Sequence, residues 1–117
     1  MDQRVKTVVW LMEENITRQV SVAELARAVN LSPWRLCHIF KSEMCVAPLQ
    51  YMRALRMQQA RKLLEETFLS VKQIMSAVGL KDESHFTRDF KKAYGLSPVR
   101  YRLTFHTSQV KPAIQYQ

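Results

Sequence analysis

The stretch SPWRLCHIFK, residues 32–41, places Cys37 beside His38, two side chains that commonly bind metals or act together in catalysis. On a helix, however, neighbouring side chains diverge by about 100°, and the other histidines, His85 and His106, lie far away in the sequence. No set of four ligands with zinc-like spacing results. The chain also has no glycine-rich phosphate loop, no nucleophile elbow and no carboxylate pair in a pocket-like context. We therefore expect no metal, no cofactor and no enzymatic activity.

The charge of the chain indicates a polyanionic partner. Eighteen Lys and Arg against ten Asp and Glu give a formal net charge of +8 in 117 residues, and the pI is near 9.9. A small domain with this charge repels itself unless a polyanion neutralises it. Double-stranded DNA is the favoured partner, while acidic membranes and solubility alone are the alternatives.

The cysteines and the hydropathy of the chain bear on its compartment. No run approaches the roughly 18 apolar residues needed to cross a bilayer, and no charged-then-apolar signal peptide opens the chain. Cys37 and Cys45 lie about 12 Å apart along one helix, too far for a disulfide. Because free thiols fit a reducing compartment, we expect a soluble cytoplasmic protein without a membrane partner.

The elements that must position these side chains are helices. Leu, Met, Ala, Arg, Lys, Gln and Glu dominate the middle of the chain, and alternating β-branched residues are rare. With 47% hydrophobic residues, only two glycines and four prolines, the composition predicts a folded all-α protein.

One helical unit occurs twice in the sequence. SVAELARAVNL (21–31) aligns with SVKQIMSAVGL (70–80), and after one inserted residue, Lys81, the alignment continues through Pro48 with Pro98 and Tyr51 with Tyr101. In each copy a short helix (22–29 or 71–78) follows an S-x-x-E/Q capping box and ends at Asn30 or Gly79. A second helix (33–44 or 83–94) follows the N-cap Ser32 or Asp82. This is the helix-turn-helix arrangement.

Further helices flank the two units. We assign residues 1–47 to an N-terminal helix-turn-helix unit that opens with a helix at about 2–16, residues 48–66 to a long linker helix, and residues 67–103 to a C-terminal unit that ends in a short helix. Residues 104–117 lose periodicity and are expected to be a disordered tail. The linker helix is about 28 Å long, and one turn of DNA is about 34 Å. We therefore expect both second helices to enter successive major grooves.

Helical periodicity separates a buried stripe from an outward face on each second helix. The stripes comprise Leu36, Ile39, Phe40 and Met44 in the first, and Phe86, Phe90, Ala93 and Tyr94 in the second. Early outward residues can reach base edges, and later ones are better placed for phosphates. The candidate base contacts are Trp34, Arg35, Cys37, His38, Glu83, Ser84, His85 and Arg88. The candidate phosphate contacts are Lys41, Ser42, Lys91 and Lys92.

Each candidate has a simpler interpretation. Trp34 would pack against the first helix as peripheral core, and His38 and the lysines would only be solvated. Glu83 is better explained by stabilisation of its helix N-terminus than by reading of cytosine. Arg88 is the strongest candidate, because its long forked side chain suits guanine or phosphate. The linker cations pair with neighbouring acids or with the two units and are not assigned to DNA: Arg53, Arg56, Arg61 and Lys62.

The segment IMSAVGLKDESHFTRDFKKAYGLSPVRYR, residues 74–102, resembles the signature of the AraC/XylS family of bacterial transcription regulators. The resemblance covers about residues 3–103 and includes the linker-helix residues Arg56, Ala60, Leu63 and Leu64. It implies seven helices in two helix-turn-helix units, asymmetric DNA sites in adjacent major grooves, and activation of transcription through RNA polymerase. The groove-facing positions that it implies coincide with the base-contact candidates above. The chain departs from the family pattern at four positions: Cys45, Met75, Leu80 and His85.

The function that we expect is sequence-specific DNA binding by a bacterial transcriptional regulator that recruits RNA polymerase. The alternative is a protein-interaction module of the same fold, which acts on polymerase or another regulator without reading DNA. A third reading, the regulatory half of a DNA-repair methyltransferase, is disfavoured because the chain lacks a cysteine cluster that could bind a metal. Many family members carry a separate sensing domain, which 117 residues do not accommodate, so we expect no small-molecule effector to bind this segment. The chain is then either a small stand-alone regulator or part of a longer one.

Overall fold

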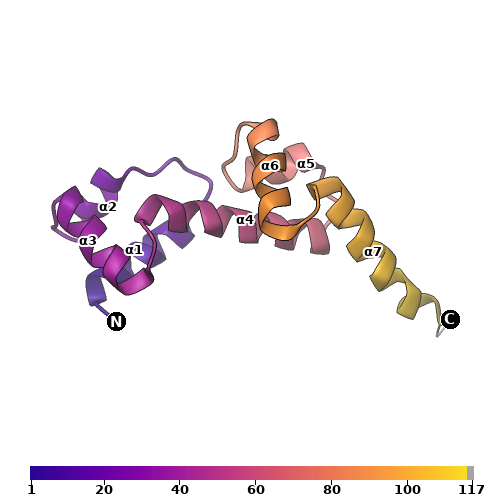
Figure 1. Ribbon diagram of the computed structural model, residues 1–117, viewed down its shortest axis with the longest axis horizontal. Helices are drawn as coiled ribbons and strands as arrows, with labels where there is room; N and C mark the ends of the chain where they lie inside the picture. Colours follow the sequence, from indigo (N-terminus) through magenta and orange to yellow (C-terminus); the bar gives the residue numbers. More distant parts are fainter. Residues whose placement is uncertain (116–117) are drawn as a thin grey trace. The chain divides into compact units, whose positions relative to one another are not determined.

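Capped, amphipathic segments fold into seven helices in the computed structural model, which describes residues 1–115 and side-chain environments up to residue 106. The helices are α1 (Gln3–Glu14), α2 (Val22–Ala28), α3 (Pro33–Met44), α4 (Pro48–Glu66), α5 (Val71–Ala77), α6 (Glu83–Tyr94) and α7 (Pro98–Gln115). No strand occurs in these described residues. The predicted all-α fold with two helix-turn-helix units is confirmed (Figure 1).

The chain divides into two compact units within α4, at Met1–Arg56 and Met57–Gln117. In the first unit α1, α2 and α3 surround the first half of α4 (Figure 1). Its core comprises Val5, Val8, Met12, Leu25, Ala26, Leu36, Phe40 and Met52. Removing these apolar side chains from water contributes about 25 cal/mol per Å² of buried surface. Because Met52 of α4 belongs to this core, the first half of α4 completes the core of the first helix-turn-helix.

The second unit has the same composition of elements. The second half of α4, together with α5, α6 and the start of α7, encloses a core of Met57, Ala60, Leu64, Ile74, Met75, Val78, Phe86 and Phe90. The buried residues Met57, Ala60 and Leu64 repeat the 3-and-4 spacing of the three buried residues of α1, namely Val5, Val8 and Met12. Each unit is therefore a helix, a helix-turn-helix and a following helix, and α4 serves as the last helix of one unit and the first of the other.

Short polar side chains start the helices as the sequence predicted. Ser21 and Ser70 both form complete capping boxes, in which the Ser hydroxyl accepts from the backbone N–H three residues later. The Glu24 or Gln73 side chain in turn accepts from the Ser backbone N–H. Each cap satisfies N–H groups that the helix leaves unpaired, which stabilises the short first helix by about 1 kcal/mol. Ser32 and Asp82 cap the second helices in the same way.

Left-handed residues end the helices of both units, but the two units use different residue types. Asn30 and Cys45 have positive φ in the first unit, at 58° and 68°, whereas the corresponding residues of the second unit are Gly79 and Gly95. The sequence departure at Cys45 therefore leaves the turn after α3 intact. It places a side chain where glycine alone is free of strain.

Helix α7 is longer than the short helix that the sequence predicted, since it continues to Gln115. Contacts with the end of α4 explain its extension through residue 106. The Arg102 guanidinium donates to the carbonyl oxygens of Leu64 and Thr67, and His106 Nε2 lies 3.2 Å from the carbonyl oxygen of Glu65. The sequence assigned residues 104–117 to a disordered tail, but residues 104–115 belong to α7, and residues 116 and 117 lie outside the described residues.

Candidate nucleic-acid interface

The second helix of each unit is held by two aromatic or aliphatic side chains one turn apart. Leu36 and Phe40 of α3 are fully buried, as are Phe86 and Phe90 of α6. In both units an edge-to-face contact joins the second phenylalanine to a tyrosine of the following helix, Phe40 to Tyr51 at 5.6 Å and Phe90 to Tyr101 at 5.5 Å between ring centroids. These contacts fix which face of each second helix remains outward.

The pattern of burial is the same in the two second helices and the turns that follow them. Buried, half-buried and exposed residues succeed one another in identical order over residues 32–51 and 82–101. One predicted stripe residue is wrong, because Ala93 is exposed, as is its counterpart Glu43. Helix α6 packs on the side of Tyr94, which contacts Phe90 and Tyr101, so Ala93 on the other side faces outward.

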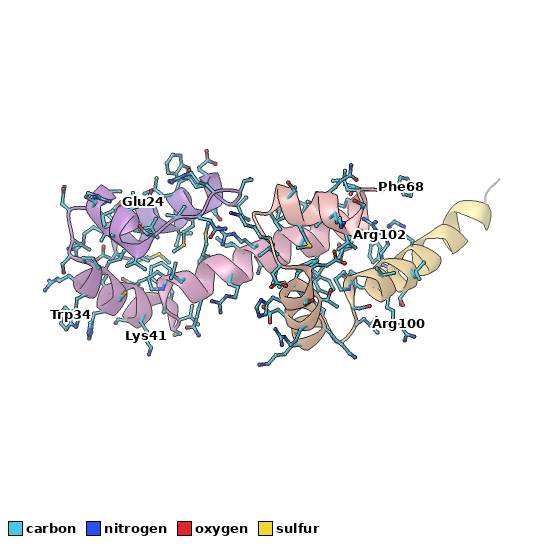
Figure 2. All side chains as sticks on the ribbon, turned by 90° about the horizontal axis from the view of Figure 1, so that it is seen from above. Glu24, Trp34, Lys41, Phe68, Arg100 and Arg102 are labelled. Carbon is cyan, nitrogen blue, oxygen red and sulfur yellow. The ribbon has the colours of Figure 1, made fainter. Side chains whose placement is uncertain are left out.

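Eleven of the twelve side chains selected from the sequence lie exposed on α3 or α6, and Cys37 is half-buried. The exposed ones on α3 are Trp34, Arg35, His38, Lys41 and Ser42. Those on α6 are Glu83, Ser84, His85, Arg88, Lys91 and Lys92. Within the first unit, Trp34 and Lys41 project to one side of α3, opposite to the side on which Glu24 of α2 lies (Figure 2). Each unit thus brings its own candidates together on one face.

Trp34 is not peripheral core. Its side chain is 68% exposed, and its ring lies over the ring of His38, with centroids 3.9 Å apart and planes tilted by 41°. Because the two residues are one helical turn apart, the pair forms within α3 itself. Two flat rings are therefore already in contact on the outward face before any partner binds.

The start of α6 carries a different arrangement. Asp82 Oδ1 accepts from the backbone N–H of His85 at 3.0 Å, and Asp82 Oδ2 lies 3.1 Å from His85 Nδ1. The hydrogen bond from the His85 backbone, joined by the nearby imidazole, lowers the pKa of the Asp82 carboxyl below its ordinary value. Glu83 occupies the first turn of α6, where its negative charge interacts favourably with the positive end of the helix dipole.

The linker cations that the sequence left unassigned have protein partners in two cases. The Arg56 guanidinium donates to the carbonyl oxygens of Ile16 and Arg18 at 3.0 and 2.8 Å, and burial lowers its pKa. The Arg61 guanidinium lies 5.3 Å from the centre of the Tyr94 ring. Both contacts lie within a single unit and stabilise it.

Two exposed cations beside α6 were missed by the sequence analysis. Lys81 immediately precedes the N-cap of α6, and Arg100 lies in the first turn of α7 with its side chain exposed (Figure 2). The signals that would have found them are the insertion of Lys81 in the second copy of the repeat and the alignment of Arg100 with uncharged Gln50. Both add exposed positive charge to the second unit.

Other kinds of site find little support in the part of the chain that the structure describes. No group of three or more His, Cys, Asp or Glu there has the arrangement needed to hold a metal ion. No buried residue there is polar or charged. No helix within the described range combines the length and apolarity of a membrane span.

Two helix-turn-helix units with basic, hydrogen-bonding outward faces define a DNA-binding domain of the helix-turn-helix class. A comparison with protein families matches residues 25–104 to the family described as "Helix-turn-helix domain". A solved AraC-type DNA-binding regulator from Chromobacterium violaceum is 30% identical, with a TM-score of 0.81 over 87% of this chain and 91% of that one. The chain belongs to the AraC-type helix-turn-helix family.

Two more similar proteins extend the comparison. The probable transcriptional regulator LumQ of Photobacterium leiognathi is 32% identical over 91 residues, which are 78% of this chain and 37% of that protein. The DNA-binding domain of AdpA, a global transcriptional factor solved in complex with a target DNA, is 28% identical, with a TM-score of 0.83 over 92% of this chain and 96% of that one. This chain thus spans little more than a third of the length of LumQ. The members of this family are transcriptional regulators and not enzymes.

Proposed function

We propose that this chain binds double-stranded DNA sequence-specifically and regulates transcription in the bacterial cytoplasm. Helices α3 and α6 insert into successive major grooves, and α4, with 19 residues and a length of about 28 Å, joins the two units that carry them. The observation that carries the proposal is the identical burial order of residues 32–51 and 82–101, which leaves the same positions outward in both units. The similar AdpA domain, solved with its target DNA, supports it.

The outward residues divide into two roles. Those in the first half of each helix contact bases, with Trp34 and His38 offering flat apolar surface in α3 and Ser84 and Arg88 offering hydrogen bonds in α6. Lysines in the last turn of each helix and the exposed Arg100 contact phosphates. The first helix then favours DNA shape and thymine methyl groups, and the second favours hydrogen-bonding base edges.

Selection from random duplexes tests the proposal directly. The expected product is an asymmetric site with two half-sites centred about 10 base pairs apart. Arg88→Ala should weaken binding to that site by about 1–3 kcal/mol, or roughly 5- to 150-fold, and should relax preference at one position only. Binding that is indifferent to sequence, with a salt dependence that accounts for all of the affinity, would refute specific recognition.

A double variant distinguishes this function from that of a protein-interaction module. His38→Ala combined with Arg88→Ala removes one outward side chain from each second helix and leaves both cores untouched. Regulation in cells should be lost in this variant if DNA is read. Unchanged regulation would instead support action on another protein.

We also propose RNA polymerase as the second partner, so that the chain acts as an activator. Support comes from the family, whose named members include an arabinose operon regulatory protein of Escherichia coli. Transcription in vitro from a template that carries the selected site upstream of a weak promoter should rise when the protein is added to purified polymerase. An equal yield with and without protein, at saturating site occupancy, argues against recruitment.

A further inference from the structure

The side chain of His85 is held by the residue that starts its helix. Asp82 uses both carboxylate oxygens: Oδ1 accepts from the His85 backbone N–H, and Oδ2 lies 3.1 Å from His85 Nδ1. Both side chains remain open to solvent, His85 at 67% and Asp82 at 58% exposure. The imidazole ring is thus oriented at the beginning of α6, where residues of a recognition helix reach base edges.

This pair determines which ring nitrogen of His85 carries a hydrogen. An ionised carboxylate can only accept hydrogen bonds, and aspartate is ionised near neutral pH. The hydrogen bond from the His85 backbone lowers the pKa of Asp82 further below its ordinary value. Nδ1, which lies 3.1 Å from Oδ2, is therefore the ring nitrogen that this carboxylate favours as a donor. In a neutral imidazole the other nitrogen, Nε2, then has no hydrogen and can only accept.

The equivalent position in the first unit has the opposite chemistry. Arg35 aligns with His85, and Ser32 aligns with Asp82. The Ser32 hydroxyl accepts from the Arg35 backbone N–H at 3.1 Å and caps α3 as Asp82 caps α6, but it supplies no carboxylate. Within the described residues the Arg35 guanidinium forms no ion pair, and arginine has only donors to offer.

We propose that Arg35 and His85 read opposite hydrogen-bonding groups of DNA: Arg35 donates to a guanine, and His85 Nε2 accepts from the exocyclic amino group of an adenine or a cytosine. In the major groove guanine presents two acceptors, whereas adenine and cytosine each present an amino donor. The inference rests on the proposed function, and it assigns a cause to the asymmetry of the site. Asp82 acts as a positioning residue, because it fixes the tautomer of His85 without touching the base.

The test begins with the site selected by the unmodified chain at about pH 8. A parallel selection with His85→Ala identifies the base pair whose preference depends on His85, and we expect that base to be adenine or cytosine. Replacing it by purine or 2-pyrimidinone, which lack the amino group, should weaken binding of the unmodified chain about 5-fold, the equivalent of one hydrogen bond of about 1 kcal/mol. The same duplex should bind His85→Ala no more weakly than the selected one.

Three variants separate the chemistry of the ring from its mere presence. His85→Glu, which can only accept, should keep the preference for an amino group, and His85→Lys, which can only donate, should shift it to guanine or thymine. Asp82→Ser keeps the helix cap, as Ser32 does in the first unit, but removes the carboxylate beside the His85 ring. The preference for the duplex with the amino group over the duplex without it should then fall by about 5-fold, with unchanged helical content.

The outcomes are distinguishable. If the unmodified chain selects no sequence, both the proposed function and this inference fail. If it selects a site whose His85-dependent base is guanine or thymine, or if the amino group can be removed without loss of affinity, the proposed function stands and the inference is overturned. A selection that is the same for the unmodified chain and His85→Ala overturns it as well.

Discussion

Replacing Cys45 by glycine is expected to stabilise the first unit, although it removes a side chain. Cys45 ends α3 with a φ of 68° and a ψ of 1°, in the left-handed region, where its Cβ crowds the backbone. Such a conformation costs a residue other than glycine about 1–2 kcal/mol. The thiol is exposed, so its removal sacrifices little buried surface.

The magnitude follows from two opposing effects. Relief of the left-handed strain contributes about 1–2 kcal/mol, and the greater freedom of glycine in the unfolded chain opposes it by about 0.4–1 kcal/mol. The net expectation is a gain of about 0.8 kcal/mol for Cys45→Gly. Gly95→Ala is the matched control, because Gly95 has a φ of 85° and a Cβ built there meets no atom within 4 Å. With no steric clash to add, it should lose a similar amount.

Thermal unfolding followed by circular dichroism in the presence of a reductant measures both changes. With an unfolding entropy of about 2.1 cal/mol/K per residue, 0.8 kcal/mol shifts Tm by about 6 °C if a unit of about 60 residues unfolds alone. The shift is about 3 °C if all 117 residues unfold together. The size of the shift therefore also reports whether the two units unfold separately. A lower Tm for Cys45→Gly, in parallel with Gly95→Ala, would show that the strain argument is wrong.

Three further predictions concern other contacts. Arg56→Ala should destabilise the first unit by about 2 kcal/mol in urea titrations, because two charge-assisted hydrogen bonds to backbone carbonyls are lost, whereas exposed Arg53→Ala should change little. Burial first, and then a hydrogen bond to a carboxylate, raise the pKa of Tyr101. The contribution of Tyr101 to stability is therefore full below about pH 10 and is lost as pH rises through its pKa in the folded state. Tyr101→Phe should flatten the decline in unfolding free energy measured between about pH 9 and 11. Lys41→Ala should weaken binding to selected and random duplexes alike and reduce the salt slope by about one, and a loss confined to the selected duplex would contradict a phosphate contact.

Local signals in the sequence were sufficient for most of the fold. Ser21, Ser70 and Asp82 start their helices because the physics of capping involves neighbours three residues away, which sequence displays directly. The outward faces followed from helical periodicity for the same reason. Ala93 was misassigned because periodicity gives the direction of a stripe but not its width, and the width depends on where α7 packs.

Contacts between residues far apart in the chain were not predictable in this way. The reach of Arg56 to the carbonyls after α1 spans about 40 residues, and the attachment of α7 to the end of α4 by Arg102 and His106 spans as many. Sequence spacing does not encode such contacts. The Asp82–His85 pair is local, but it depends on the rotamer of the histidine, and the sequence analysis treated His85 only as an outward group. DNA contact by the selected side chains stays a prediction.

The repeated order of buried and exposed residues in 32–51 and 82–101 also makes the chain suitable for engineering. Because the same positions face outward in both units, the outward side chains of α6 can be transplanted onto α3 without disturbing either core. A chain modified in this way would carry the same outward side chains in both units, and under the proposed function it should select two copies of a single half-site. The outward side chains of α3 and of α6 can therefore be changed separately, and with them the expected base preference of each half-site.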